Sequence, residues 1–321
     1  MVILRPLGVG DLLTAVPALR ALADAFKGHE RVLAAPAALA PLAELVQAGD
    51  DRPAVHRVVP VGPLEPLPPE LDGATVAVNL HGRGPESHRI LLASRPGRVL
   101  WFENPDVPES RGSPRWLAGE HEVDRWCRML AELGVPADPA RLLLEVPAGH
   151  STDEYAGCVI VHPGAASAAR RWHPARFAAV ARALAAQGHR VIVTGSAKEV
   201  PLAWGVANRA GLGEADVLAG RTDLSALAAL VARARAVICG DTGMGHMATA
   251  FGTPSVVLFG PTPPAHWGPP IGSPQHRTLW AGRMGDPHAD EPFPGLMELT
   301  VDQALRAVAD VTERVPSGMS K

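Results

Sequence analysis

Short apolar runs alternate with segments of helical spacing along most of this 321-residue chain. Apolar runs bounded by polar, Gly or Pro positions predict buried strands, and apolar residues three and four positions apart predict amphipathic helices. The predicted strands span residues 2–4, 31–35, 76–80, 98–101, 159–162, 191–194, 216–218, 236–239 and 255–259. The clearest predicted helices span residues 175–186 and 224–234. This alternation indicates an α/β fold with mostly parallel, doubly wound sheets.

The series of strands and helices breaks once, near residues 147–152 (Pro-Ala-Gly-His-Ser-Thr), a composition typical of a linker. We therefore expect a Rossmann-like amino-terminal domain over residues 1–150 and a Rossmann-like carboxyl-terminal domain over residues 151–321, facing each other across a cleft. A long loop region, residues 260–299, is expected to precede the last helix, residues 301–314. That helix is a candidate to pack back on the amino-terminal domain.

Composition narrows the class of protein without defining its chemistry. Hydrophobic residues make up 47% of the chain and charged residues 20%, as in soluble globular proteins. The net charge of −3 argues against a nucleic-acid partner held by bulk charge. No segment resembles a transmembrane helix, and the chain opens as a strand, not as a signal peptide. Cys127, Cys158 and Cys239 lack CxxC spacing, which favours reduced thiols in a cytoplasmic protein.

The most informative local pattern is Ile-Cys-Gly-Asp-Thr-Gly-Met-Gly-His-Met-Ala at residues 238–248. Its order predicts that Asp241, Thr242 and His246 lie at the carboxyl end of a buried strand and the start of a helix. Backbone N–H groups and the helix dipole bind anions at such a position, and ligands of open α/β sheets bind at this edge. The alternative is an ordinary strand-to-helix turn in which Asp241 is an N-cap.

A second glycine-bearing turn follows the first predicted strand. Gly8 and Gly10 fit a GxGxxG dinucleotide fingerprint, but Leu13 occupies the third glycine position. No acidic residue after the next strand is placed to bind a ribose, so NAD binding is disfavoured. Asp11 in this turn is either a capping carboxylate or a general base at the mouth of the amino-terminal domain.

Three blocks, in this order and spacing, resemble glycosyltransferase family 9, the heptosyltransferase family. The first is Arg-Pro-Leu-Gly-Val-Gly-Asp-Leu-Leu-Thr-Ala-Val-Pro at residues 5–17. The second is His-Pro-Gly-Ala at 162–165 followed by Arg-Arg-Trp-His-Pro-Ala-Arg-Phe at 170–177. The third comprises Gly-Arg-Thr-Asp-Leu at 220–224, Gly-Asp-Thr-Gly-Met-Gly-His-Met-Ala at 240–248, Gly-Thr-Pro at 252–254 and Phe-Gly-Pro-Thr at 259–262. Together they cover most of the carboxyl-terminal half and the first turn of the amino-terminal half.

The resemblance implies a GT-B fold and the transfer of heptose from ADP-heptose to an acceptor hydroxyl. It implies inversion at the anomeric carbon, no metal and no cofactor beyond the ADP-sugar donor. Asp11 matches the family's catalytic aspartate. The implied donor-binding residues are Ser167, Arg170, Arg171, Asp241, Thr242, Gly243 and His246.

Individual roles follow from that match. Arg170 aligns with a family lysine and, with Arg171, is expected to neutralise the diphosphate, since no Asp-x-Asp metal motif is present. Asp241 is expected to accept hydrogen bonds from sugar hydroxyls, and His246 to lie near the phosphates or the sugar. The chain departs from the family where Ala165 and Ala166 replace hydroxyl residues after the His-Pro-Gly turn. Plain packing is the preferred interpretation of His162 and Trp172.

The region expected to bind the acceptor is the part least similar to the family. The candidate acceptor-binding residues are His81, Arg83, His88 and Arg125. The resemblance implies a lipopolysaccharide-core acceptor, with another glycan or a small natural product left open. It also implies a cytoplasmic protein, with at most peripheral association at the inner face of the membrane, and no nucleic-acid partner.

Two other classes of function remain open from the residues alone. A non-catalytic nucleotide-sugar binding protein would keep the loop at residues 241–246 and would not need Asp11. A sugar-nucleotide epimerase of the same double-Rossmann plan would not explain the Arg-Arg-Trp block at residues 170–172.

Overall fold

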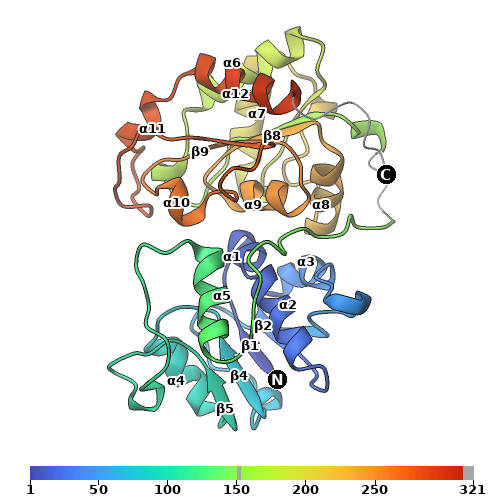
Figure 1. Cartoon of the computed structure of the whole chain (residues 1–321). Helices are drawn as coiled ribbons and strands as arrows, with labels where there is room; N and C mark the ends of the chain where they lie inside the picture. The colour runs from blue at the N-terminus through green and yellow to red at the C-terminus, as the bar shows by residue number, and fades with distance from the viewer. Residues whose placement is uncertain (150–152, 314–321) are drawn as a thin grey trace. The chain divides into compact units, whose positions relative to one another are not determined.

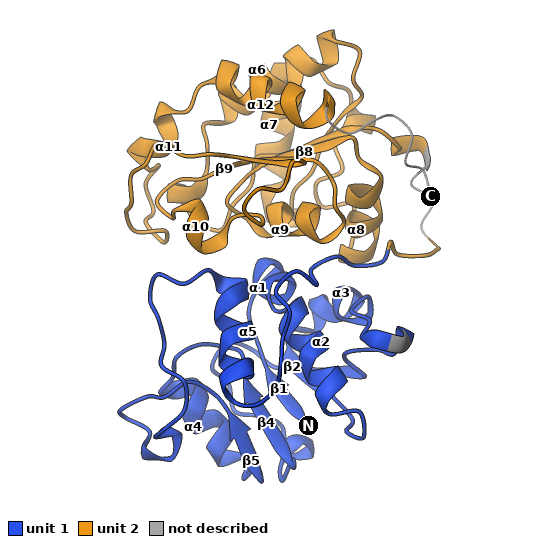
Figure 2. Ribbon diagram, in the orientation of Figure 1, with its two compact units in different colours: residues 1–145 blue, residues 146–321 orange. Residues whose placement is uncertain are grey.

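The computed structural model describes residues 1–149 and 153–313 of the chain, which forms two compact units. The amino-terminal unit is Met1–Glu145 and the carboxyl-terminal unit is Val146–Lys321 (Figure 2). Each contains a five-stranded sheet whose paired strands are all parallel. The prediction of doubly wound α/β architecture is therefore confirmed for both units.

The sheet of the amino-terminal unit has the strand order β3-β2-β1-β4-β5. Its strands are β1 (Val2–Leu4), β2 (Val32–Ala35), β3 (Arg57–Pro60), β4 (Val76–Asn79) and β5 (Arg98–Leu100). Its helices are α1 (Val9–Thr14), α2 (Val16–Ala25), α3 (Ala40–Glu44), α4 (Glu86–Ala93) and α5 (Glu122–Glu132). The order reverses between β1 and β4, which places a topological switch point at the carboxyl ends of these two strands.

The sheet of the carboxyl-terminal unit has the order β10-β9-β8-β6-β7. Its strands are β6 (Val159–His162), β7 (Val191–Val193), β8 (Ala236–Gly240), β9 (Ser255–Leu258) and β10 (His276–Leu279). Its helices are α6 (Pro174–Ala186), α7 (Val200–Ala210), α8 (Leu224–Arg233), α9 (Gly243–Ala250), α10 (Pro264–Trp267), α11 (Pro294–Glu298) and α12 (Val301–Glu313). The switch point here lies between β6 and β8.

The central strands are apolar along their whole length because helices cover both faces of each sheet. In the carboxyl-terminal unit, α6, α7 and α12 lie on one side of the sheet and α8 and α9 on the other (Figure 1). Val161 and Ile238, neighbours across the β6–β8 ladder, are both completely buried. The apolar core thus fixes the two strands whose ends form the switch point.

Several predicted boundaries differ from the structure. Residues 216–218 are not a strand, because only Val217 makes an isolated bridge to Val193. The region 260–299 is not one long loop, since it contains α10, β10 and α11.

The last helix packs on its own unit, which corrects the expectation that it returns to the amino-terminal domain. Over Val301–Glu313 it lies against α6, β8, β9 and β10. Its apolar face explains this position, because Val308 and Val311 are buried in the same core cluster as Leu258. Of the predicted linker, residues 147–149 are described, and His150, Ser151 and Thr152 lie outside the described residues, as does Arg314.

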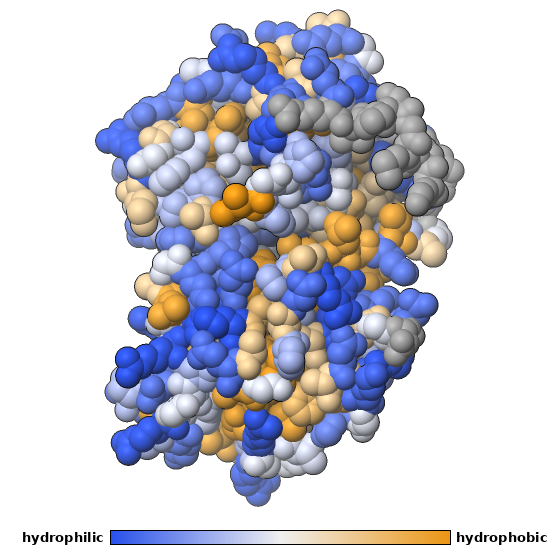
Figure 3. Space-filling view, viewed as in Figure 1, coloured by the Kyte–Doolittle hydropathy of each residue, from blue (hydrophilic) through white to orange (hydrophobic). Residues whose placement is uncertain are grey.

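No helix in residues 1–149 and 153–313 is long and apolar enough to cross a membrane. The face of the molecule shown in Figure 3 is largely hydrophilic, with apolar residues in small groups. Cys127, Cys158 and Cys239 are free and buried, and burial raises the pKa of all three thiols. They are therefore protonated, packed side chains.

Trp172 provides a test of the packing interpretation. It is 1% exposed, meets Phe177 edge to face at 5.1 Å between ring centroids, and donates from Nε1 to the Leu299 carbonyl at 3.1 Å. Trp172→Ala should lower the free energy of unfolding by roughly 3–5 kcal/mol, the usual loss for a large aromatic in a core. Urea denaturation followed by circular dichroism measures this loss.

Trp172→Phe is the matched control, because it keeps an aromatic ring and removes the hydrogen bond. It should cost far less than the alanine variant, with about 1 kcal/mol attributable to the bond. A loss below about 1 kcal/mol for Trp172→Ala would contradict a packing role.

Candidate functional site

Two sequence blocks meet at the switch point of the carboxyl-terminal unit. Asp241 directly follows β8, and Thr242 is the N-cap of α9, with its Oγ1 accepting from the Met244 N–H at 3.2 Å. The predicted placement of Asp241, Thr242 and His246 at a strand end and helix start is confirmed. Thr242, not Asp241, is the capping residue. The Asp241 side chain is therefore not used by the cap.

Glycine allows the second block to approach the ends of the strands. The short 3-10 turn η6 (Ala168–Arg170) crosses β8 and β9 so closely that a Cβ on Gly240 would lie 2.8 Å from the Arg170 carbonyl oxygen. A Cβ on Gly260 would lie 2.9 Å from the Ala169 carbonyl oxygen. Only glycine fits at both positions without a shift of backbone, so these two motif glycines hold the η6 turn against the sheet.

This approach brings Arg170 to Asp241. Arg170 Nη1 donates to the Asp241 carbonyl oxygen at 3.4 Å, and its Nε donates to Ser167 Oγ at 3.3 Å. Ser167 Oγ in turn donates to the Pro287 carbonyl oxygen at 2.5 Å. Three predicted donor residues, from two separate segments of the chain, therefore form one connected group.

Asp241 is 6% exposed. Burial raises its pKa to about 6, although the Arg170 charge and a hydrogen bond from Thr262 both lower it. A buried carboxylate with one nearby cation is suited to accepting hydrogen bonds from a ligand that reaches it.

The remaining predicted donor residues lie around this group. Arg171 is exposed, and its Nε donates to the Ala165 carbonyl oxygen at 2.8 Å. His246 is half-buried and meets Trp267 edge to face at 5.9 Å between ring centroids. Trp267 was not predicted, because the short helix α10 carries no motif that marks it. His162 Nδ1 is 3.0 Å from Thr194 Oγ1, and burial lowers the pKa of this imidazole.

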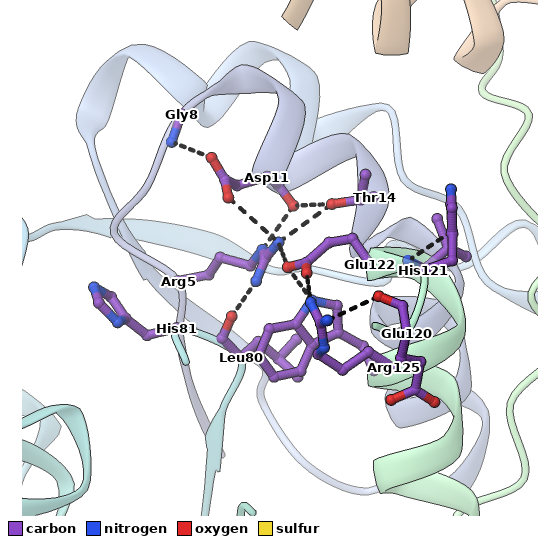
Figure 4. A network of polar contacts seen from close by, with 12 residues as sticks. Arg5, Gly8, Asp11, Thr14, Leu80, His81, Glu120, His121, Glu122 and Arg125 are labelled. Atoms are coloured by element: carbon purple, nitrogen blue, oxygen red, sulfur yellow. Dashed lines mark hydrogen bonds and ion pairs between the residues drawn. The ribbon is translucent and has the colours of Figure 1, made fainter. Parts of the chain in front are cut away.

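A second polar group lies at the switch point of the amino-terminal unit and is centred on Arg5 (Figure 4). Arg5 is 1% exposed, and its Nε donates to the Asp11 carbonyl oxygen at 2.6 Å. Nη1 donates to the Leu80 carbonyl oxygen, and Nη2 donates to Thr14 Oγ1 and Glu122 Oε1, both at 3.2 Å. The guanidinium therefore joins the ends of β1 and β4 to α5.

Asp11 lies at the exposed side of this group. Its Oδ2 accepts the Gly8 N–H at 3.1 Å, and its Oδ1 is 3.7 Å from Arg5 Nη2. The side chain keeps 28% of its surface exposed. Asp11 thus orders its own turn and still presents a carboxylate to solvent. The geometry therefore fits both a capping carboxylate and a general base.

Glu122 and Trp126 complete the network and were not predicted. Glu122 Oε1 accepts from Trp126 Nε1 at 2.8 Å, and Arg5 lies 4.9 Å from the Trp126 ring centroid. A glutamate in the first turn of an amphipathic helix gives no signal of burial in the sequence. Its role depends on Arg5, which is distant in the chain.

Two candidate acceptor residues are corrected, because they are buried inside the amino-terminal unit. His88 is completely buried, stacks on Trp101 at 4.7 Å, and its Nε2 is 2.8 Å from the Phe102 carbonyl oxygen. Arg125 is 6% exposed and pairs with Glu122 through Nη1 while donating from Nη2 to the Glu120 carbonyl oxygen at 2.8 Å. Both side chains serve the fold.

The other two candidates remain accessible. Arg83 is exposed and lines a pocket in this unit. His81 is half-buried, and its Nε2 is buried without a hydrogen-bond partner among the described residues. Burial and the Arg5 charge lower the pKa of His81, against an opposing effect of Asp11. A neutral imidazole at this position can donate to or accept from a ligand.

Two doubly wound units, each with a polar group at its switch point, define a protein of the GT-B class. The sequence profile described as glycosyltransferase family 9 (heptosyltransferase) matches residues 110–289, more than half of the chain. The chain therefore belongs to glycosyltransferase family 9, as the three sequence blocks predicted.

Individual relatives agree with this assignment. Lipopolysaccharide heptosyltransferase 3 of Escherichia coli is 32% identical over 162 residues, which cover 50% of this chain and 47% of that protein. Sequence matches to such curated relatives span between 28% and 48% of their lengths.

Two solved structures extend the similarity in fold to nearly the whole chain. E. coli ADP-heptose lipopolysaccharide heptosyltransferase II superposes with a TM-score of 0.77 at 20% identity, covering 97% of this chain and 98% of that one. An E. coli heptosyltransferase solved with ADP-2-deoxy-2-fluoro heptose superposes with a TM-score of 0.69 at 19% identity, covering 96% and 98%.

The raised pKa of Asp241 predicts a pH-dependent stability. Above about pH 6 the folded chain holds a buried carboxylate at a cost in free energy. Below about pH 4 the carboxyl is protonated in folded and unfolded chains alike, and the cost is absent. Asp241→Asn should therefore gain stability over the wild type as the pH rises from 4 through 6, by up to about 3 kcal/mol.

Urea denaturation across this pH range measures the difference between the variant and the wild type. Asp290→Asn, which changes an exposed carboxylate of the same unit, is the control and should show no such dependence. A constant difference between Asp241→Asn and wild type from pH 4 to pH 8 would contradict the buried, destabilised carboxylate.

Proposed function

We propose that this protein transfers a heptose from ADP-heptose to an acceptor hydroxyl, with inversion at the anomeric carbon and without a metal ion. The proposal rests chiefly on one contact: Arg170 donates a hydrogen bond to the backbone of Asp241 at the switch point of the carboxyl-terminal unit. A member of the same fold binds an ADP-heptose analogue, which supports this choice of donor.

In this proposal the donor diphosphate lies against the first N–H groups of α9 and the guanidinium of Arg170 or Arg171. The N–H of Gly243, the first helical residue, has no partner within the helix, and the dipole there favours anions. Guanidinium groups bind phosphate oxygens bidentately and so neutralise the charge that develops on the leaving ADP. Asp241 accepts hydrogen bonds from the sugar hydroxyls, and His246 lies beside the donor.

Asp11 is the proposed general base. The proton of the acceptor hydroxyl passes to the Asp11 carboxylate as the acceptor oxygen forms a bond to the anomeric carbon. The bond from that carbon to the β-phosphate oxygen breaks, and ADP leaves with the electron pair. A single displacement inverts the anomeric centre. The partly exposed carboxylate of Asp11, held in place by the Gly8 N–H and Arg5, supports this assignment.

The acceptor is proposed to bind the amino-terminal unit near His81 and Arg83. The unpartnered Nε2 of His81 and the exposed Arg83 support this placement. The acceptor class is a glycan, of which a lipopolysaccharide core is the leading example, and a small natural product is the alternative. The proposed setting is the cytoplasm, with at most peripheral contact with a membrane and no nucleic-acid partner.

Replacing Asp11 by asparagine tests the proposed reaction. The wild type should transfer heptose from ADP-heptose to a lipopolysaccharide core acceptor in the presence of excess EDTA. Asp11→Asn keeps the size of the side chain and removes the base, so turnover should fall by a factor on the order of 10² to 10⁴. Mass spectrometry of the product measures turnover, and calorimetry should show unchanged ADP affinity.

Asp72→Asn, which alters an exposed carboxylate paired with Arg95, is the control and should retain full turnover. An equal loss of ADP affinity and turnover in Asp11→Asn would make Asp11 a binding or structural residue. Unchanged turnover would favour a protein that binds nucleotide sugars without this base. Loss of activity in EDTA with recovery on adding a divalent metal would overturn the metal-free mechanism.

Arg170→Ala tests the placement of the donor. Loss of one charge-assisted hydrogen bond should weaken ADP binding roughly 10- to 150-fold by calorimetry. Arg182→Ala, which removes an exposed arginine on α6, should leave it unchanged. If ADP binds Arg170→Ala as tightly as it binds the wild type, the diphosphate does not lie against this residue.

A further inference from the structure

The loop between β10 and α11, residues 280–293, packs on the η6 turn that carries Arg170. Residues 280–293 contain no helix or strand, so their shape depends on local hydrogen bonds. Two carbonyl groups of this loop reach η6 and its start. The Pro287 oxygen accepts from Ser167 Oγ at 2.5 Å, and the Ala289 oxygen accepts the Ala169 N–H at 3.1 Å.

The contact with Ser167 fixes the direction of the serine hydroxyl. A serine hydroxyl has one proton to donate and two lone pairs. Because its proton goes to the Pro287 carbonyl oxygen, a lone pair remains for Arg170 Nε, which donates to Ser167 Oγ at 3.3 Å. The Asp241 carbonyl oxygen holds the same guanidinium through Nη1. A guanidinium held in this way loses less side-chain freedom when it binds a phosphate.

The contact with Ala169 is buried. Ala169 is 1% exposed, so its N–H would lose its partner, away from water, if the Ala289 carbonyl group moved. The other side of Ala169 lies against Gly260, where a Cβ would come within 2.9 Å of the Ala169 carbonyl oxygen. The position of Arg170, the next residue, therefore depends on the loop as well as on the sheet.

Asp286 gives residues 285–289 their shape. The Ala289 N–H donates to the Asp286 carbonyl oxygen at 3.4 Å, which closes a four-residue turn with Asp first and Pro287 second, a favoured order. Asp286 Oδ1 accepts the His288 N–H at 2.8 Å. This bond from backbone to side chain orders the turn and requires an acceptor atom on the side chain. Asp286 thus orients the two carbonyl groups that hold Ser167 and Ala169.

The same loop also contacts the segment beside Asp241. The Gly285 N–H donates to the Pro261 carbonyl oxygen at 3.1 Å. Thr262, the next residue, donates a hydrogen bond to the Asp241 carboxylate. Residues 285–289 therefore support both of the segments that meet at this switch point.

We infer that residues 285–289 hold Arg170 in place for the donor diphosphate, and that Asp286 is a positioning residue for this arginine. This inference rests on the proposed binding of the diphosphate by Arg170. Asp286 has the same sign of charge as the diphosphate, so its charge alone would weaken donor binding. Loss of the side chain should therefore weaken ADP binding if Asp286 positions Arg170, and strengthen it if Asp286 acts only by repulsion.

NMR titrations of the full-length protein with ADP and with adenosine test this role. Asp286→Ala should weaken ADP binding roughly 2- to 10-fold, the usual loss for one hydrogen bond, and leave the affinity for adenosine, which has no phosphate, unchanged. Asp286→Asn keeps an oxygen for the His288 N–H and should bind ADP at least as tightly as the wild type. Added to Arg170→Ala, Asp286→Ala should cause no further loss, because the residue through which it acts is absent.

Amide hydrogen exchange without any ligand tests the contact itself. The Ala169 N–H should exchange faster in Asp286→Ala than in the wild type or Asp286→Asn, because its acceptor is no longer held. Asp290→Ala is the matched control, since it removes an exposed carboxylate of the same loop. It should change neither ADP affinity nor the exchange of Ala169.

Unchanged or tighter ADP binding in Asp286→Ala, an equal loss for adenosine, or an equal loss in Asp286→Asn would each overturn the inference. Unchanged exchange of the Ala169 N–H in Asp286→Ala would do the same. A loss of ADP affinity in Arg170→Ala without one in Asp286→Ala would remove this inference alone. No loss in Arg170→Ala would remove the proposed donor placement and the inference with it, so the two failures are distinct.

Discussion

The guanidinium of Arg5 is the interaction on which the amino-terminal unit depends. A charge that is 1% exposed is costly to bury unless its donors are all used, and here they are spread over the ends of β1 and β4, the first turn and α5. Among the described residues, removing Glu122 would leave the buried Arg5 guanidinium with only the more distant Asp11 carboxylate, at 3.7 Å, as an ionic partner. The same network orients the turn of Asp11 and, through Arg125, extends to the Trp116 ring.

In the carboxyl-terminal unit, close packing of backbone segments, and not a buried cation, positions the polar residues at the switch point. Gly240 and Gly260 let the η6 turn approach the ends of β8 and β9 so closely that any side chain would collide with it. This contact places Arg170 beside the buried Asp241, whose raised pKa reflects the cost of that position. The Asp241 carboxylate is buried at a cost in free energy, has one cation nearby and does not cap α9. These properties fit a role in binding a ligand.

The sequence predicted the central strands and the strand-to-helix site because these depend on local patterns. Continuous apolar runs produce β1, β6 and β8, and the Gly-Asp-Thr-Gly order produces the start of α9. The missed strands, β3 and β10, lie at sheet edges, where Arg57, Pro60, His276 and Arg277 interrupt the apolar pattern. The reverse error at residues 216–218 arose because an apolar run makes only one bridge beside the edge strand β7.

Polar residues of the amino-terminal unit were harder to predict. His88 and Arg125 were expected at the surface because polar residues usually lie there. Their burial depends on partners far along the chain, Phe102 for His88 and the Arg5–Glu122 pair for Arg125, which no local spacing reveals.

The central claim is that the carboxyl-terminal unit binds the nucleotide of the donor while the turn of Asp11 does not. Amide hydrogen exchange of the full-length chain, with and without saturating ADP, tests it most directly. The account predicts slower exchange in residues 162–172 and 240–246, with no change in residues 5–14. Protection of residues 5–14 by ADP, without protection of the other two segments, would contradict it.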